Sequence, residues 1–397
     1  MESRRDPVWF ATSPSSHRAG AELVRRIAEI TPARRLPDLD LRGGGVQVWT
    51  PSDSSSTELE PALTVAAAAA ELGLVADSSG SQQIELAVDT TDPAAVVPFW
   101  QTVLGYGDDL RDPLGRDPGF EFRSASEHRP LRNRIHVDLA VPARFAIDRL
   151  DHLRTSGDRV AMGEGGYHAL VTDADGNEAD LLPVTLEGDR LDGADVDDWR
   201  VLFEAAVFYP IGDRPRAVEL VAAAAAAADE GGVPLLIDVR AAGVRIGSGK
   251  DLWEDERFPA VAHRVQAAAH GLGLSADAAP LRFLQIGLDA VDVAAVREFW
   301  RLALGYEEDP RPYVTDINHP HRLGPTLFVS QMEASDTARR AQRNRIHLTL
   351  LVASDQLRSR VDDVVAAGGR VVEDGEAPHR WTLADPEGNE LSVVAFD

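Results

Sequence analysis

One segment of the sequence occurs twice, and this repeat constrains the fold more than any other feature. The first copy runs from Gln82 to Tyr106 and the second from Arg282 to Tyr306, 200 residues later. Each copy starts as an apolar stretch of strand character, reaches an Asp, and continues into a helix that carries Phe-Trp and ends at Leu-Gly-Tyr. Gly suits a helix end because it adopts the left-handed backbone conformation without a Cβ clash. Such self-similarity indicates a chain built from duplicated units.

Two further motifs recur in the same order. Asn133 to His136 (NRIH) reappears as Asn344 to His347, and each copy runs into a strand-like stretch. Asp173 to Glu178 (DADGNE) reappears as Asp385 to Glu390 (DPEGNE). Asp, Pro, Gly and Asn are typical of turns between strands. Three motifs at a nearly constant offset indicate a tandem duplication.

Together these motifs resemble the vicinal oxygen chelate superfamily, which includes glyoxalase I, extradiol dioxygenases and bleomycin-resistance proteins, and most closely its glyoxalase-like branch. The resemblance covers roughly residues 82–185 and 281–397. It implies two βαβββ modules in each copy, with sheets that curl round a shared cavity. The sequence leaves open whether the two copies pack on each other or whether each closes its own barrel.

The segment before each glyoxalase-like copy also repeats a plan of helix, two strands and helix. This order resembles pterin-4a-carbinolamine dehydratase. That family has a His-His-Pro segment between its first helix and its strands, where this chain has Arg34-Arg35-Leu36-Pro37 and Gly231-Gly232-Val233-Pro234. The resemblance therefore implies the fold and a docking or dimerisation role, without dehydratase activity. The expected helices are His17 to Ile30, Glu58 to Leu72, Arg216 to Ala228 and Glu254 to His270.

We therefore predict an α+β fold, in which a small α-β-β-α module is followed by a paired βαβββ glyoxalase-like domain and the whole plan is repeated in tandem. The predicted domains are 1–80 and 187–280 for the pterin dehydratase-like modules, and 81–186 and 281–397 for the glyoxalase-like domains.

The superfamily resemblance also implies a metal site. Its ligands come from inward-facing positions on the first and last strands of each module. Transferred residue by residue, these positions are Glu85, His136 and Asp180 in the first copy, with Glu121 as a further carboxylate for proton transfer. One imidazole and two carboxylates suit a divalent metal such as Fe, Mn, Zn or Ni. Such an ion could hold two neighbouring substrate oxygens and stabilise negative charge on them.

The same positions in the second copy are Gln285, His347 and Ser392, of which only His347 is a strong ligand. We therefore expect no metal there. The identical NRIH context of His136 and His347 supports the alternative that both do the same structural job in a sheet. His319 and His321 lie in a loop that could line the mouth of a cavity, with a solvated loop as the alternative.

Composition excludes several classes of protein. The chain has no Cys, which excludes disulfides, thiolate metal sites and a Cys nucleophile. Its net charge of −25 makes nucleic acid an unfavourable partner, because an acidic surface repels phosphate. No stretch resembles a signal peptide or a membrane span, so we expect a cytoplasmic protein.

Three functions remain compatible with the sequence. The first is a metal-assisted enzyme of the lyase, isomerase or dioxygenase type that acts on a small oxygenated metabolite. The second is a metal-free protein that binds or sequesters a small molecule, as bleomycin-resistance proteins do. The third is a structural or regulatory protein without an active site. The sequence leaves the oligomeric state open, with a homodimer as one alternative.

Overall fold

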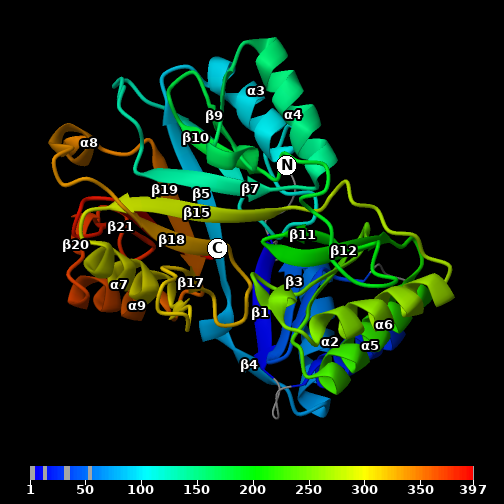
Figure 1. The fold of residues 1–397 in the computed structure, drawn as a ribbon. Coiled ribbons are helices and arrows are strands. Elements are labelled where there is room, and N and C mark those ends of the chain that lie inside the picture. Colours follow the sequence, from blue (N-terminus) through cyan, green and yellow to red (C-terminus); the bar gives the residue numbers. More distant parts are fainter. Residues whose placement is uncertain (1–4, 12–15, 31–35, 52–55, 397) are drawn as a thin grey trace. The chain divides into compact units, whose positions relative to one another are not determined.

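The computed structural model describes residues 5–11, 16–30, 36–51 and 56–396, and it divides into two compact units. Unit 1 consists of the described residues of 1–81 together with 189–281, and unit 2 consists of 82–188 and 282–396. Figure 1 shows the course of the chain through them. Each unit thus joins a segment of the first half of the sequence to a segment of the second. The four predicted sequence domains stay a prediction.

Unit 1 contains one eight-stranded sheet with the order β11-β12-β14-β13-β2-β3-β1-β4. Antiparallel pairing of β2 with β13, with Asp40 opposite Asp238, joins the two halves of this sheet. The strands are β1 (Arg5–Ala11), β2 (Leu39–Arg42), β3 (Gly45–Pro51), β4 (Val75–Asp77), β11 (Arg200–Leu202), β12 (Glu204–Pro210), β13 (Leu236–Arg240) and β14 (Gly243–Gly247). The helices are α1 (His17–Ile30), α2 (Ser56–Glu71), α5 (Arg214–Gly231) and α6 (Phe258–Gly271), with short 3-10 turns at Ser78–Gly80 and Leu252–Glu254.

The predicted order of helix, two strands and helix is present in both halves of unit 1. The last helix begins at Phe258 rather than at Glu254. Pro259 explains this start, since proline has no N–H to donate and is favoured in the first turn of a helix. The outer strands β1, β4, β11 and β12 were not anticipated. Part of the compared Arg34 to Pro37 segment lies outside the described residues, and the resemblance to pterin dehydratases stays a prediction.

Buried ion pairs fix the junction between β2 and β13. Arg42 Nη2 lies 2.8 Å from Asp238 Oδ1, and Arg240 forms the matching pair with Asp40 across the strands. Arg245 pairs with two carboxylates of this network: its Nη1 lies 3.1 Å from Asp238 Oδ2, and its Nη2 contacts Glu204. Breaking one partner of such a pair leaves a buried charge uncompensated, so these residues hold the strands in this register.

Unit 2 contains two sheets, and each combines the first part of one glyoxalase-like copy with the last part of the other. The His136 sheet has the order β16-β17-β18-β15-β7-β10-β9-β8, and the His347 sheet has the order β20-β21-β22-β19-β5-β6. Antiparallel pairing of β15 with β7 joins the copies in the first, and pairing of β19 with β5 joins them in the second. Neither copy therefore closes a sheet of its own, which answers the question that the sequence left open.

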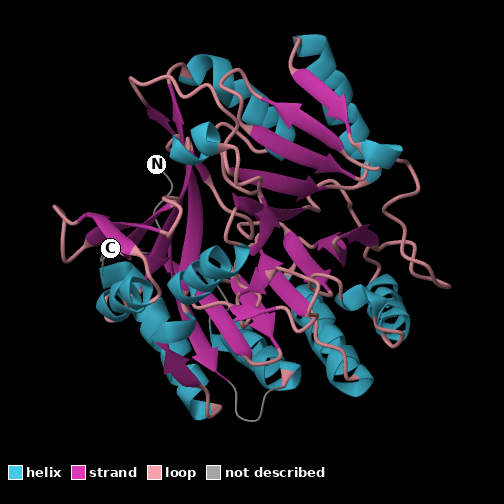
Figure 2. Cartoon of the chain, turned by 60° about the vertical axis from the view of Figure 1, so that its left-hand side comes forward, coloured by secondary structure: helices cyan, strands magenta, loops and turns pink. Residues whose placement is uncertain are grey.

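The strands of unit 2 are β5 (Gln82–Thr90), β6 (Phe120–Ser124), β7 (Ile135–Ala140), β8 (Arg159–Met162), β9 (Ala169–Thr172), β10 (Glu178–Leu182), β15 (Phe283–Ala290), β16 (Glu307–Glu308), β17 (Ile317–Asn318), β18 (Thr326–Gln331), β19 (Ile346–Val352), β20 (Arg370–Glu373), β21 (Arg380–Ala384) and β22 (Glu390–Ala395). Its helices are α3 (Pro93–Leu104), α4 (Ala143–Ser156), α7 (Val293–Leu304), α8 (Thr337–Ala341) and α9 (Leu357–Ala366), with a 3-10 turn at Glu164–Gly166. Figure 2 distinguishes these helices, in cyan, from the strands, in magenta. The α+β class is confirmed.

The repeated motifs build the core of unit 2. Trp100 and Trp300 are fully buried, as expected for core residues. The Trp100 indole donates a hydrogen bond to Asp173 (2.9 Å), and Trp300 donates the equivalent one to Asp385 (3.0 Å). Each of these carboxylates opens a GNE turn, so helix and turn are locked together in both copies.

The NRIH motif connects the two copies. The buried Arg134 donates from Nη1 to the carbonyl of Glu387 (2.8 Å) in the second copy. Arg345 donates from Nε to Asn177 Oδ1 (2.9 Å) in the first. Burial lowers the pKa of both arginines. Each arginine therefore holds the turn of the opposite copy.

None of the helices in the described ranges combines the length and apolar character of a membrane span.

Candidate metal site

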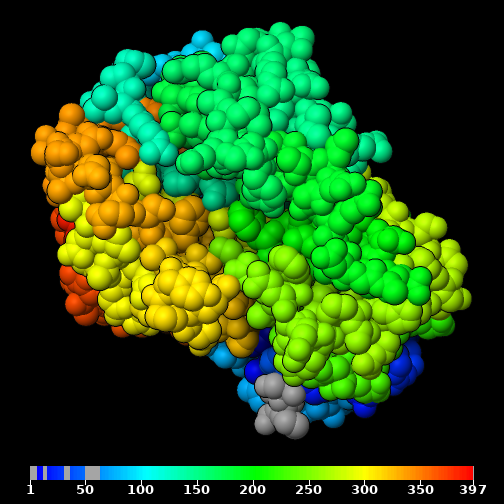
Figure 3. All heavy atoms as spheres, viewed as in Figure 1, coloured from blue at the N-terminus to red at the C-terminus, as the bar shows by residue number. Residues whose placement is uncertain are grey.

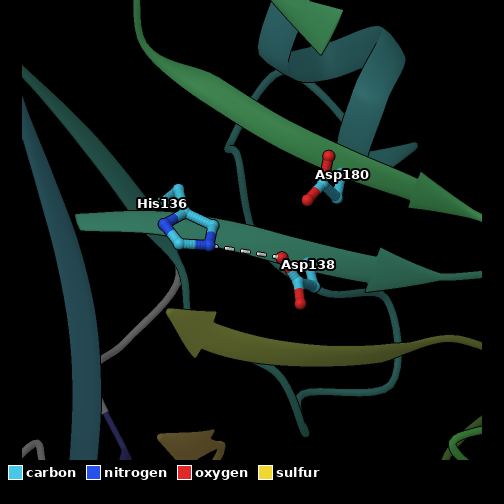
Figure 4. Close-up of side chains that lie close together, drawn as sticks. All are labelled: His136, Asp138 and Asp180. Atoms are coloured by element: carbon cyan, nitrogen blue, oxygen red, sulfur yellow. Dashed lines mark ion pairs between the residues drawn. The ribbon is translucent and has the colours of Figure 1, made fainter. Parts of the chain in front are cut away.

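One imidazole and two carboxylate side chains meet on one face of the His136 sheet. Side chains alternate between the faces of a strand, so His136 and Asp138 on β7 point to the same side, opposite the buried Val137. Asp180 on the neighbouring strand β10 stands level with Asp138. Figure 4 shows all three side chains projecting from the same side of the two strands. One ligand atom from each lies within 4.8 Å of those of the other two.

The environment of this group favours a positive ion. His136 Nε2 lies 3.7 Å from Asp138 Oδ1, which is close enough for charge interaction but too long for a hydrogen bond. Burial and then the neighbouring Asp138 carboxylate raise the pKa of Asp180, against the opposite influence of His136 and His168. A divalent cation between the carboxylates would remove this repulsion. The donor set of one nitrogen and two carboxylates therefore fits a divalent metal.

Gly287 makes room for the imidazole. It stands opposite His136 on the adjacent strand β15. A Cβ atom at this position would lie 2.3 Å from His136 Nε2 and 2.7 Å from Phe328 Cζ, which real Cβ atoms do not tolerate. Phe328 meets the imidazole edge to face, with ring centroids 5.8 Å apart. Glycine and the aromatic ring together define where the His136 side chain lies.

Gln285 orients one of the carboxylates. It stands opposite Asp138 on β15 and donates from Nε2 to Asp138 Oδ2 (2.9 Å). Hydrogen bonds of this kind hold a ligating carboxylate in position and tune the metal that it binds. From the sequence, Gln285 was placed at the corresponding position of the second copy. Because β15 pairs with β7, Gln285 lies instead beside the candidate site of the first copy.

Of the four residues predicted for the site, the structure brings only His136 and Asp180 together. Glu85 lies on β5 of the His347 sheet, level with Thr349, and its carboxylate is 3.2 Å from Arg111 Nη1. The transfer that joined Glu85 to His136 assumed that each copy forms its own sheet. In the structure the first module of copy one instead pairs with the last module of copy two.

Glu121, the predicted proton-transfer residue, is also on the His347 sheet. Its side chain on β6 is 60% exposed, and its carboxylate oxygen Oε2 lies 2.7 Å from Arg123 Nη2. It is not part of the group around His136, for the same topological reason.

Asp138 was missed, although the sequence contains a signal for it. It follows His136 by two residues in a strand, and this spacing places both side chains on one face. The pattern His-x-Asp could have been recognised from this alternation. The sequence contains no signal that Gly287 makes room for the His136 ring, because this contact depends on which strand pairs with β7.

The corresponding face of the His347 sheet is organised differently. Thr349 and Ser392 stand side by side on β19 and β22, in the places of Asp138 and Asp180. His347 Nε2 lies 3.1 Å from Asp89 Oδ2, and Arg129 donates to the same oxygen (2.8 Å). His347 is thus part of a buried ion-pair network.

Comparisons with known proteins show which family the chain belongs to. A family model described as a glyoxalase-like domain matches residues 85–182 and 285–394, just over half of the chain. Among solved structures, glyoxalase I from Zea mays is 10% identical over 79% of this chain and 93% of its own, with a TM-score of 0.39. A putative dioxygenase from Bacillus subtilis is 9% identical over 78% of this chain and 84% of its own, also with a TM-score of 0.39. A search of curated proteins finds no match. The chain belongs to the glyoxalase-like domain family, within the vicinal oxygen chelate superfamily.

Proposed function

We propose that this protein is a divalent-metal-dependent enzyme that acts on a small oxygenated metabolite at the His136 sheet. The observation that carries the proposal is the group of His136, Asp138 and Asp180. Within the described ranges, no other set of three His, Asp or Glu side chains brings its ligand atoms so close together. Membership of the glyoxalase-like family supports an enzyme of the lyase, isomerase or dioxygenase type.

The three residues would hold Fe, Mn, Zn or Ni through one imidazole nitrogen and two carboxylate oxygens. When bound, such an ion supplies Lewis-acid stabilisation of negative charge on two neighbouring substrate oxygens. Three protein ligands leave coordination positions for these oxygens, as in catalytic rather than structural metal sites.

The chain's own residues prepare the site for this task. Gln285 holds Asp138 by its amide N–H, so the carboxylate is positioned before metal or substrate arrives. Gly287 and Phe328 confine the ring of His136. Burial and the neighbouring Asp138 carboxylate raise the pKa of Asp180, and a bound cation would favour its charged form.

A substrate screen tests the function. The protein is loaded with each of the four metals under reducing, low-oxygen conditions and incubated with compounds that carry two neighbouring oxygens. We expect turnover with at least one metal, loss of turnover in His136→Ala, and retention in His347→Ala. Turnover that persists in His136→Ala, or after the metal is removed by a chelator, would contradict the proposal.

The same screen separates the proposal from ligand sequestration. A ligand that binds only the folded state raises the melting temperature. Compounds that stabilise the metal-free protein equally well, without turnover, would favour a metal-free binding protein.

A further inference from the structure

The His347 sheet has its own group of polar side chains at the places that correspond to the candidate metal group. Thr349 on β19 stands level with Ser392 on β22, and Ser392 stands opposite Thr382 on β21. Paired residues on adjacent strands point to the same face. These three side chains therefore form one line across the sheet, which we call the hydroxyl row.

The hydroxyl row lies on the face of the sheet that is turned away from the core. Trp381 and Leu383, the neighbours of Thr382 in β21, belong to the hydrophobic core, and α9 packs against β21 and β22. Because side chains alternate along a strand, Thr382 points to the opposite side. The C-terminal segment that contains β20 and β21, orange to red in Figure 3, reaches the surface.

The hydroxyl groups of this row are recessed but open to solvent. Ser392 is 7% and Thr382 is 9% exposed, although no core residue covers them on this face. Within the described ranges the hydroxyls of Thr349 and Thr382 form no hydrogen bond, and neither oxygen is among the buried atoms that lack a partner. Both hydroxyls can therefore donate to a ligand.

Arg380 adds a positive charge at the end of the hydroxyl row. It begins β21 two residues before Thr382, so the two side chains share a face. One of its five N–H donors is used by Ser392, whose Oγ accepts from Arg380 Nη2 (3.4 Å) and keeps its own proton for another acceptor. Among the described residues, Arg380 forms no ion pair with a carboxylate.

The nearest carboxylates on this face already have partners. Glu390, two residues before Ser392 on β22, accepts from Nε and Nη2 of Arg343 at 2.8 and 2.7 Å. Glu85, level with Thr349 on β5, lies 3.2 Å from Arg111 Nη1. Both negative charges are thus balanced by other arginines, and the charge of Arg380 stays available to a ligand.

The same places of the two sheets therefore carry opposite chemistry. Thr349 and Ser392 replace Asp138 and Asp180. Arg380, five residues before the buried Asp385, takes the place of His168, five residues before the buried Asp173. Carboxylates offer lone pairs to a cation, whereas a guanidinium and hydroxyl groups offer N–H and O–H donors to an anion.

We propose that Arg380 and the hydroxyl row form a binding site for a small oxyanion, the carboxylate or phosphate group of a small molecule. A guanidinium holds its N–H donors in a plane that matches two oxygens of either group. The hydroxyls of Thr349, Thr382 and Ser392 complete the set of donors. The site is separate from the proposed metal-dependent activity, because it shares no residue with the candidate metal group.

Calorimetric titration of the full chain with inorganic phosphate and with acetate tests the site. Bound metal is first removed with a chelating resin, and the ionic strength is held constant because salt screens charge interactions. We expect saturable binding of at least one of the two anions. Binding of phosphate alone assigns the site to phosphate groups, and binding of acetate alone assigns it to carboxylates. If neither anion binds saturably, the proposal is wrong.

Three variants locate the bound anion. Arg380→Gln should weaken binding roughly ten- to hundredfold, the range expected for hydrogen bonds from a charged group. Thr382→Val removes only a hydroxyl and should weaken binding roughly fivefold. The control is Arg358→Gln on α9, where the side chain is 73% exposed and pairs with Asp362. It removes the same charge on the core side of the sheet and should leave the affinity unchanged.

Two results in these variants would overturn the proposal. Unchanged affinity in folded Arg380→Gln would show that the anion binds elsewhere, and equal weakening in Arg358→Gln would show a response to net charge alone. Asp180→Ala separates this site from the metal site: it should bind the anion as tightly as the native chain. Loss of the anion in Asp180→Ala would place it at the His136 sheet instead. Anion binding in a chain that retains no metal would leave this proposal standing although the proposed function had failed.

Discussion

The two sheets of unit 2 share one scaffold but differ on the face that holds the candidate metal group. Both contain the NRIH motif, the buried tryptophan and the turn that begins with a buried Asp. On the His136 sheet this face holds Asp138 and Asp180, and on the His347 sheet the same places hold Thr349 and Ser392. The duplicated motifs therefore specify the fold, whereas a few positions on one face of each sheet decide whether the candidate metal group is present.

The two histidines illustrate the difference. His136 lies over Gly287 and beside Asp138. His347 stands opposite Ala87 and contacts Asp89 instead. A Cβ atom in the place of Gly287 would overlap the ring of His136, so the methyl group of Ala87 is incompatible with that ring position. The two histidine rings therefore differ in position where one sheet has Gly287 and the other has the methyl group of Ala87.

The largest expected effect comes from removing a ligand. His136→Ala should weaken metal binding by more than roughly 100-fold, because losing a ligand costs more than losing an outer partner of a ligand. His347→Ala should leave metal affinity unchanged and lower the melting temperature, since it leaves Asp89 with one partner fewer. Titration calorimetry and thermal unfolding of both variants check this. Equal loss of metal affinity in the two variants would show that the two sheets do not differ in metal binding.

The second effect concerns the space beside the histidine. Gly287→Ala should displace the imidazole and weaken metal binding roughly ten- to hundredfold, as for other changes that misplace a ligand. The matched change on the other sheet, Ala87→Gly, should leave metal affinity as it is. If Gly287→Ala binds metal normally while remaining folded, the glycine does not position His136.

A third pair of variants tests where the sheets should behave alike. Trp100→Phe and Trp300→Phe each remove an indole N–H from a buried carboxylate, Asp173 or Asp385. Burial raises the pKa of both carboxyl groups, and the hydrogen bonds from Asn177 or Asn389 and from the indole oppose it. Each variant should lose about 1.5 kcal/mol of unfolding free energy in denaturant titrations. A clearly unequal loss would show that the scaffold is not shared.

The smallest effect is a pH dependence specific to the His347 sheet. Burial favours the protonated form of Asp89, but hydrogen bonds from His347 and Arg129 outweigh it and hold the pKa of Asp89 below its usual value. A carboxylate with a depressed folded-state pKa stabilises the fold above its unfolded pKa of about 3.9 and loses this contribution as the pH falls further. The cost of Asp89→Asn should thus be full at pH 7 and shrink below about pH 4. A cost that stays constant down to pH 3 would contradict this account.

Much of the fold could be predicted because it depends on local signals. The helices that contain Trp100 and Trp300, the Gly residues that end them, and the turns at Asp173 and Asp385 were all predicted from repeated motifs. The pairing of β5 with β19 could not be predicted in this way. Both copies contain nearly the same modules, so strand patterns alone do not tell a module which partner it pairs with.

The candidate site could be predicted only in part, for the same reason. His136 and Asp180 belong to one module, so their relation survived the exchange of modules, while Glu85 and Glu121 went to the other sheet. Gln285 and Gly287 arrived at the site from a strand about 150 residues away in sequence. Long-range pairing is decided by side-chain packing and burial, which the motifs do not encode.

Metal stoichiometry tests directly whether the His136 sheet binds an ion. The full chain, purified without a His-tag, is incubated with Fe, Mn, Zn or Ni under reducing conditions, desalted and measured by elemental analysis alongside Asp180→Ala and Ser392→Ala. We predict about one tightly held ion per chain, which is lost in Asp180→Ala and kept in Ser392→Ala. No retained ion with any metal, or an ion that survives in Asp180→Ala and disappears in Ser392→Ala, would contradict the assignment of the site to the His136 sheet.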